Sequence, residues 1–183
     1  MQKIFIGFLF VFFDLTVNAN GHVVGILPDF VGYIFIFMGC REMAEESDDF
    51  SKPYPFIVGM TVYGAVIWVL ELLGITYYGD TWPFATLSMV VTCVPLYIDY
   101  CIILGVRDME NTYNSSFRSG TLDNVWFATV IFSVAGVIAL MLLPVLGAIC
   151  IAGVMAAHVV FLYQFYQAKR EYSQAMGVKM EEQ

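Results

Sequence analysis

Charged residues are scarce in this chain, and basic residues are the scarcest. Of the 183 residues, 13% are charged and 60% are hydrophobic. A soluble domain is about half apolar and about a quarter charged. The 8 Lys and Arg residues are outnumbered by 16 Asp and Glu residues, which gives a net charge of −8. A nucleic-acid-binding surface requires clustered basic residues, so the composition argues against a nucleic acid partner.

Motifs for catalysis and metal binding are also missing. The four cysteines form no CxxC pair and lie in or at the end of apolar runs, which indicates buried free thiols rather than a redox motif or a zinc site. The sequence contains no Walker motif, no HExxH, no GxSxG and no paired-histidine spacing. We therefore expect neither an enzyme nor a cofactor, and the sequence leaves open whether a metal binds.

Long apolar runs take the place of these motifs. They predict an all-α integral membrane protein with six transmembrane helices in three hairpins. The predicted helices cover residues 4–18, 27–43, 56–74, 84–106, 122–143 and 145–167. The last two form one run that would measure ~67 Å as a single helix, whereas the hydrocarbon core is ~30 Å thick, so the chain must turn back, at Pro144. Residues 1–183 then form one transmembrane domain, with a cytoplasmic tail at 168–183.

The first two apolar segments are short for a full span. Each has about 15 residues, which corresponds to ~22 Å of helix. They either cross the membrane, extended through residues 23–27, or form a re-entrant hairpin that the other helices bury. Both ends of either arrangement lie on one side of the membrane, so the charge pattern does not distinguish them.

The basic residues predict the orientation. All eight fall on the same side of the six-helix arrangement, and the three loops on the other side contain none. They are Lys3, Arg41, Lys52, Arg107, Arg118, Lys169, Arg170 and Lys179. Because Lys and Arg are enriched on the cytoplasmic side, this distribution places both termini in the cytoplasm.

The segment His22–Glu42 combines glycines with a carboxylate. Gly25, Gly32 and Gly39 are seven residues apart and would share one helix face, to which Asp29 also belongs. A glycine face allows a neighbouring backbone to approach closely, so we expect Asp29 to point into protein. Ala148, Ala152 and Ala156 form a second stripe of small residues, which predicts helix packing within the chain or with a partner subunit.

The same segment resembles a family. Its LPDFVGYIFIFMGCREM, with the preceding FFDL, resembles small multi-span membrane proteins of Gram-positive bacteria that carry an LPDF-x-GY sequence and have no assigned activity. The resemblance implies a multi-pass protein of the bacterial cytoplasmic membrane. In size, helix number and orientation, the predicted architecture is also similar to the S-components of energy-coupling-factor transporters. Those carry an AxxxA-type coupling face on their first helix, where this chain has only Gly7 as a small residue.

Carboxylates near the predicted outer helix ends suggest a binding site. Asp14, Asp29 and Glu71 each lie within about a turn of that end, where no Lys or Arg could neutralise them. Clustered carboxylates without a basic partner attract a cation. Capping for Asp29 and solvation for Glu71 are the alternatives. The other expected ligand-binding residues are Asn18, His22, Trp68, Tyr78 and Trp82.

The fourth predicted helix carries a polar face that leads toward the cytoplasm. Ser88, Thr92, Pro95 and Asp99 share this face, and Pro95 leaves the carbonyl of the preceding turn partly unpaired. Together with His158 of the sixth helix, Ser88, Thr92 and Asp99 would form a proton or ion relay. Hydrogen bonding between helices is the alternative interpretation.

These patterns predict a polytopic bacterial membrane protein that binds or transports a small cationic or neutral solute through an outward-facing, carboxylate-lined site. The alternative is a non-transporting membrane subunit that assembles with a partner, as a homo- or hetero-oligomer, through its glycine and alanine faces. In either case the lipid bilayer is the surrounding medium.

Overall fold

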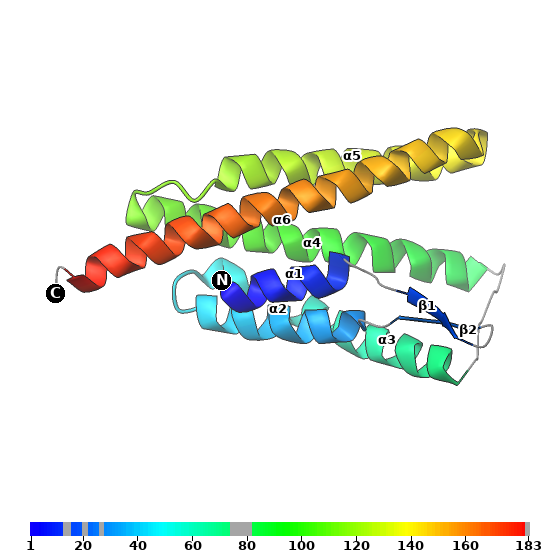
Figure 1. Ribbon diagram of the computed structural model, residues 1–183, viewed down its shortest axis with the longest axis horizontal. Coiled ribbons are helices and arrows are strands. Elements are labelled where there is room, and N and C mark those ends of the chain that lie inside the picture. The colour runs from blue at the N-terminus through cyan, green and yellow to red at the C-terminus, as the bar shows by residue number, and fades with distance from the viewer. Residues whose placement is uncertain (13–15, 20–21, 26–27, 74–81, 182–183) are drawn as a thin grey trace. The chain divides into compact units, whose positions relative to one another are not determined.

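The computed structural model describes residues 1–12, 16–19, 22–25, 28–73 and 82–181. Side chains are described for 1–12, 28–73, 90–139, 143 and 145–177. This part of the chain is mostly helical, which confirms the expected all-α class, whereas the six membrane crossings and the orientation stay predictions (Figure 1). Its elements are α1 (Gln2–Phe12), β1 (Thr16–Ala19), β2 (His22–Gly25), α2 (Asp29–Met43), the 3₁₀ turn η1 (Asp48–Ser51), α3 (Tyr54–Leu72), α4 (Trp82–Tyr113), α5 (Ser119–Leu142) and α6 (Pro144–Glu181).

The chain divides into two compact units. Unit 1 covers Met1–Ile102 and unit 2 covers Ile103–Gln183, with the division inside α4.

Four helical segments in the described residues are long and apolar enough to cross a membrane. They are Asp48–Leu72, Val90–Tyr113, Ser119–Ala139 and Val145–Gly177. Large apolar side chains of these segments face outward, including Val62 with 59% and Val145 with 75% of its surface exposed. A soluble monomer rarely exposes apolar surface over such lengths. The structure therefore supports a membrane protein.

The first predicted helix ends earlier than expected. It was predicted to cover residues 4–18, but α1 ends at Phe12, and residues 16–19 pair with residues 22–25 as an antiparallel hairpin. The reason is local, because Thr16, Val17, Val23 and Val24 are β-branched and favour strands. α1 and α2 have 11 and 15 residues. They correspond to ~16 and ~22 Å of helix, less than the ~30 Å hydrocarbon core.

Glycines set the close packing of α1 against α2. A Cβ atom placed on Gly32 would lie 2.8 Å from the Gly7 carbonyl oxygen, and one on Gly39 would lie 2.6 Å from the Ile4 nitrogen. The expected glycine face is thus confirmed for Gly32 and Gly39. Gly25 was wrongly included in that face, because it is the last residue of β2 rather than part of the helix.

Aromatic contacts hold the rest of unit 1 together. Phe37 of α2 packs on Tyr54 at the start of α3, with ring centroids 5.1 Å apart, and Phe30 packs edge-on against Trp68 at 5.8 Å. The two helices are therefore antiparallel neighbours. β2 packs beside α3, and the ring of Tyr97 in α4 lies 4.8 Å from that of Phe56 in α3.

Unit 2 is built on the antiparallel pair α5 and α6, with Leu143 as the single residue between them (Figure 1). The pair packs closely where a Cβ on Gly153 would lie 2.9 Å from the ring of Phe132. The turn at Pro144 agrees with the prediction within one residue. α6 continues to Glu181, so most of the predicted tail at 168–183 is helical.

Candidate functional site

The predicted outer site corresponds to one end of unit 1. Asp29 is the first residue of α2, and Glu71 lies in the last turn of α3. These two ends meet because Phe30, next to Asp29, packs on Trp68, three residues before Glu71. The hairpin β1–β2 lies at the same end, since β2 packs beside α3 (Figure 1). The structure thus brings two of the three expected carboxylates to one end of a helix pair.

The two carboxylates differ in their surroundings. Asp29 is exposed, whereas Glu71 and Trp68 are half-buried. The expectation that the glycine face would turn Asp29 into protein is therefore not met, because the packed part of that face begins one turn later, at Gly32. An exposed aspartate at a helix start can stabilise the first-turn N–H groups and remain open to a ligand from solution.

For several expected site residues, the structure describes the backbone alone or does not describe the residue. Asp14 and Tyr78 lie outside the described residues. Asn18 and His22 are placed in β1 and β2, Gly25 at the end of β2, and Trp82 and Ser88 in α4, in each case by the backbone alone. No group of three or more potential metal ligands occurs among the described residues.

The expected relay is divided between the two units. Thr92 is exposed and Asp99 is buried, with 7% of its surface accessible; both belong to the unit 1 part of α4. His158 is half-buried on α6 of unit 2. The relay of Asp99 and His158 therefore stays a prediction.

Tyr33 is a polar residue that the sequence did not single out. Its side chain is buried in α2, with 4% of its surface accessible. It lies near Asp29, one turn earlier in the same helix, and near Asp99 of α4. The i, i+4 spacing of Asp29 and Tyr33 was visible in the sequence, but the proximity of Asp99 depends on how α4 packs.

The alanine stripe of α6 does not face α5. Ala148, Ala152 and Ala156 are all exposed, whereas Gly153, between them, packs on Phe132. The stripe therefore lies on the outer side of the α5–α6 pair. It remains free for packing outside that pair or for lipid.

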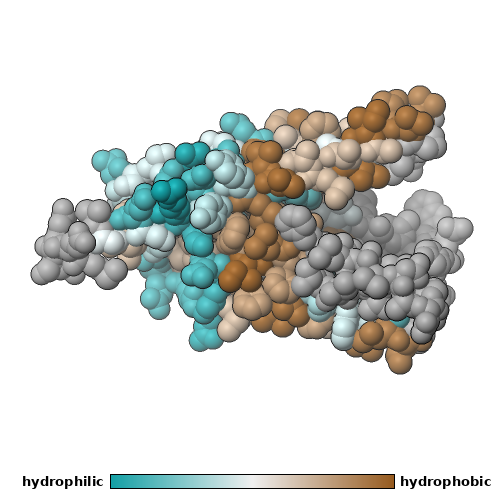
Figure 2. Space-filling view, viewed as in Figure 1, coloured by the Kyte–Doolittle hydropathy of each residue, from teal (hydrophilic) through white to brown (hydrophobic). Residues whose placement is uncertain are grey.

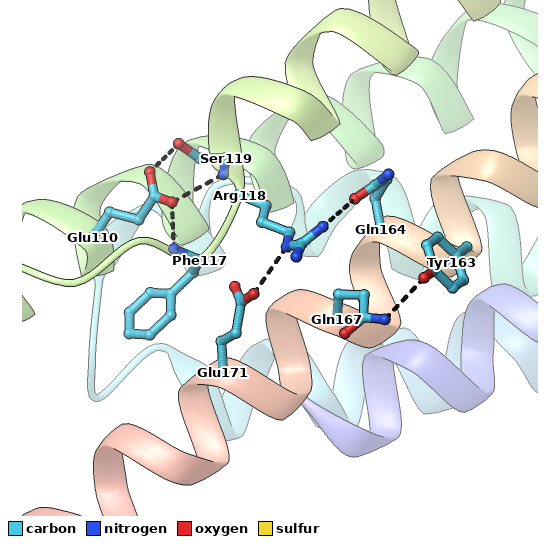
Figure 3. A network of polar contacts seen from close by, with 8 residues as sticks. All are labelled: Glu110, Phe117, Arg118, Ser119, Tyr163, Gln164, Gln167 and Glu171. Carbon is cyan, nitrogen blue, oxygen red and sulfur yellow. Dashed lines mark hydrogen bonds and ion pairs between the residues drawn. The ribbon is translucent and has the colours of Figure 1, made fainter.

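Unit 2 contains a polar network where α4 passes into α5. The Glu110 carboxylate accepts hydrogen bonds from the Phe117 and Ser119 backbone N–H groups and from the Ser119 hydroxyl (Figure 3). It thereby caps the first turn of α5, whose N–H groups have no partner within the helix. The sequence signal for this cap was weak, because Glu110 lies in a different helix, nine residues before Ser119.

Arg118 extends this network to α6. It adopts a left-handed backbone conformation, with φ of 64°, which is rare for a non-glycine residue. Its guanidinium donates to Glu171 at 2.8 Å and to Gln164 at 3.3 Å (Figure 3). A second pair, Arg107 with Asp123 at 2.9 Å, joins α4 to α5. The network anchors the α4–α5 connection to α6.

The ion pairs of unit 1 lie at the end opposite Asp29 and Glu71, and unit 2 also has a hydrophilic end. In unit 1, Lys3 at the start of α1 pairs with Glu42 at the end of α2, and Lys52 pairs with Asp49 of η1. In unit 2, Figure 2 shows apolar residues over α5 and α6 near their turn and hydrophilic residues over the opposite part of the pair. This is the distribution expected if one end of each unit meets an aqueous phase.

Comparisons of the chain with protein-family models, with curated proteins and with solved structures found no match.

Proposed function

We propose that this protein binds a small cationic or neutral solute at the end of unit 1 where α2 begins and α3 ends, and that it does so from the outer side of a membrane. Asp29 and Glu71 supply the negative charge; Asp14, the third carboxylate expected from the sequence, lies outside the described residues. The observation that carries the proposal is the Phe30–Trp68 contact, which holds the first residue of α2 beside the last turn of α3.

The charge pattern supports a cation as the preferred ligand. No Lys or Arg occurs between Lys3 and Arg41 or between Lys52 and Arg107, so these carboxylates lack a basic neighbour in their own segments. Two carboxylates in a partly apolar setting are stabilised by a bound positive charge. Trp68 is half-buried one turn before Glu71, and an aromatic face is a favourable contact for an organic cation.

The proposed topology follows the basic residues. Both termini lie in the cytoplasm of a bacterium, α3 to α6 cross its cytoplasmic membrane, and α1 and α2 enter it from the cytoplasmic side. Because α1 and α2 are each shorter than the hydrocarbon core, the re-entrant arrangement is favoured over two complete spans. Lys3, Arg41 and Lys52 then share the cytoplasmic side.

Binding is tested with purified protein in detergent. Na⁺, Mg²⁺ and choline chlorides are added at matched ionic strength, and the unfolding temperature is recorded for the wild type, Asp29→Asn and Glu71→Gln. A ligand at ten times its Kd stabilises the folded state by about 1.4 kcal/mol. We expect at least one of the three cations to stabilise the wild type, and each variant to weaken its affinity at least tenfold.

The matched control is Glu45→Gln. Glu45 is exposed after the opposite end of α2, so this variant changes the net charge equally without touching the site. If all three variants weaken binding alike, the effect is one of net charge. If Asp29→Asn and Glu71→Gln fail to fold, the carboxylates are structural and the site is disproved.

The exposed alanine stripe supports a second function, as a membrane subunit that assembles with a partner or with a second copy. Small residues on an outward helix face allow close helix–helix contact in lipid. Ala152→Leu should reduce the oligomer or release a co-purifying partner, as measured by size-exclusion chromatography with light scattering. Ile151→Phe, which is also exposed on α6 but lies about 100° around the helix from Ala152, is the control. Equal elution of the wild type and Ala152→Leu would contradict assembly through this face.

A further inference from the structure

We propose that Asp99 is a proton-binding site inside unit 1, and that its proton exchanges with the Asp29 end of α2 through the Tyr33 hydroxyl. The proposed solute site uses neither Asp99 nor Tyr33. The proton site therefore does not require that a solute binds.

Asp99 is a buried carboxyl group within a segment that can cross a membrane. It belongs to the segment Val90–Tyr113 of α4, ~13 Å of helix from the first residue and ~21 Å from the last. Only 7% of its surface is accessible. Ionisable residues inside transmembrane segments are rare, and those that occur mark ion pathways and proton relays. An aspartate at this position therefore indicates a functional site.

The Asp99 carboxyl has no partner that would stabilise a negative charge. Within the described residues it takes part in no ion pair and no side-chain hydrogen bond. An isolated carboxylate is costly to bury, whereas the protonated carboxyl carries no charge. Binding a proton removes this cost and requires a single carboxyl oxygen.

The groups around Asp99 leave this proton as the main change of charge. The described titratable groups beside this part of α4 in unit 1 are Tyr33 and Cys40 of α2 and Tyr97, Tyr100 and Cys101 of α4. Tyrosine and cysteine side chains are uncharged at pH 7. The ion pair of Lys52 with Asp49 lies near Cys101, and its two charges offset each other.

Tyr33 connects Asp99 with the first turn of α2. Its side chain is buried, with 4% of its surface accessible, and it lies near both Asp29 and Asp99. Cys40 of α2 also lies near Cys101 of α4, so the two helices are neighbours in this region. A tyrosine hydroxyl both donates and accepts hydrogen bonds. It can therefore accept a proton from the Asp29 side, give its own proton to the Asp99 carboxylate and remain neutral.

Proton binding is tested by the pH dependence of stability. The wild type and Asp99→Asn are unfolded with SDS between about pH 5 and pH 7, where the aspartates of an unfolded chain are ionised. The folded wild type holds one proton that its unfolded chain has released, so its stability falls as the pH rises. We expect the unfolding equilibrium constant of the wild type, divided by that of Asp99→Asn, to rise about tenfold for each pH unit.

A ratio that does not change with pH would overturn the proposal. A ratio that changes when NaCl is replaced by choline chloride at constant pH would do the same, because Asp99 would then bind a metal cation. If Asp99→Asn does not fold, the equally uncharged Asp99→Leu takes its place. If neither variant folds, the carboxyl group is structural and the proton site is disproved.

The route is tested with Tyr33→Phe, which removes the hydroxyl and keeps the ring. The protein is transferred rapidly into heavy water, and infrared spectroscopy follows the carbonyl band of the protonated carboxyl that Asp99→Asn lacks. We expect Tyr33→Phe to slow deuterium exchange of this band at least tenfold and to keep the pH dependence of stability. Tyr63→Phe, at a half-buried position of α3, is the control and should exchange like the wild type. Equal exchange rates of Tyr33→Phe and the wild type would overturn the route through Tyr33.

The proton site and the solute site are tested separately by these measurements. A pH-dependent ratio without any cation-dependent stabilisation would disprove the solute site and leave the proton site standing. A constant ratio with cation-dependent stabilisation would do the opposite.

Discussion

Replacing Gly39 by alanine should separate α1 from α2. The new Cβ atom would lie 2.5 Å from the Ile4 Cγ1 atom and 2.6 Å from the Ile4 backbone nitrogen. The Ile4 side chain can rotate away, but the backbone nitrogen moves only with the whole helix. Non-bonded heavy atoms pack best about 3.5–4.0 Å apart, so α1 must retreat by roughly 1 Å.

The expected loss of stability in Gly39→Ala follows from this displacement of α1. Inserting a methyl group into a well-packed contact destabilises a protein by about 1–3 kcal/mol. We expect a value toward the upper end, because a rigid shift of α1 also loosens its contacts with Gly32 and Ile36. Alanine is a better helix former than glycine by about 1 kcal/mol, which offsets part of the loss. The net expectation for Gly39→Ala is a loss of about 1–2 kcal/mol.

Gly59→Ala is the matched comparison. Gly59 lies in α3 of the same unit, and a Cβ atom there would meet nothing within 4 Å. This variant should gain about 0.5–1 kcal/mol from helix propensity alone. The folded fraction of both variants is measured by tryptophan fluorescence as a function of SDS mole fraction. If the two substitutions shift the transition in the same direction and by a similar amount, the close approach of α1 and α2 is refuted.

Two further predictions concern the network of unit 2, measured by the same SDS titration. Glu110→Ala should destabilise the protein by about 2 kcal/mol, because hydrogen bonds to a charged group contribute about 1.5–3 kcal/mol and three donors lose their acceptor. Glu110→Gln should destabilise the protein less. Equal stability of the wild type, Glu110→Ala and Glu110→Gln would disprove the cap. Asp123→Ala should cost less than about 1 kcal/mol, because both partners of the Arg107 pair are more than a third exposed; a larger loss would show a structural role for that pair.

The apolar pattern predicted the helical architecture well. The turn at Pro144 and the approximate starts of the helices from α2 onward follow from run length and from proline, which act locally. The ends were predicted less well, because α4 continues to Tyr113 and α6 to Glu181 rather than ending at residues 106 and 167. The glycine spacing predicted a close helix contact at Gly32 and Gly39, because a seven-residue interval returns to the same helix face, but it did not identify α1 as the neighbour. These features can be predicted without knowing which element packs against the helix.

The hairpin was missed because its signals compete with an apolar run. The sequence does carry them, since Asn20-Gly21 separates two β-branched stretches and favours a two-residue turn. The location of Tyr33 near Asp99 and the capping of α5 by Glu110 could not be predicted, because each depends on how distant segments pack. For the candidate site, helix order predicted that Asp29 and Glu71 share an end, whereas the exposure of Asp29 was not predicted, because the packed part of the glycine face begins only at Gly32.

The single-residue turn between α5 and α6 has a consequence for how the protein enters a membrane. Leu143 is the residue outside the two helices, and Leu143, Val145 and Leu146 at the turn are all exposed and apolar. A connection this short cannot leave one helix in the bilayer while the other waits in the aqueous phase. We therefore expect α5 and α6 to insert together during biosynthesis, as a preformed helical pair. Their leading tip carries no charge that would have to be translocated.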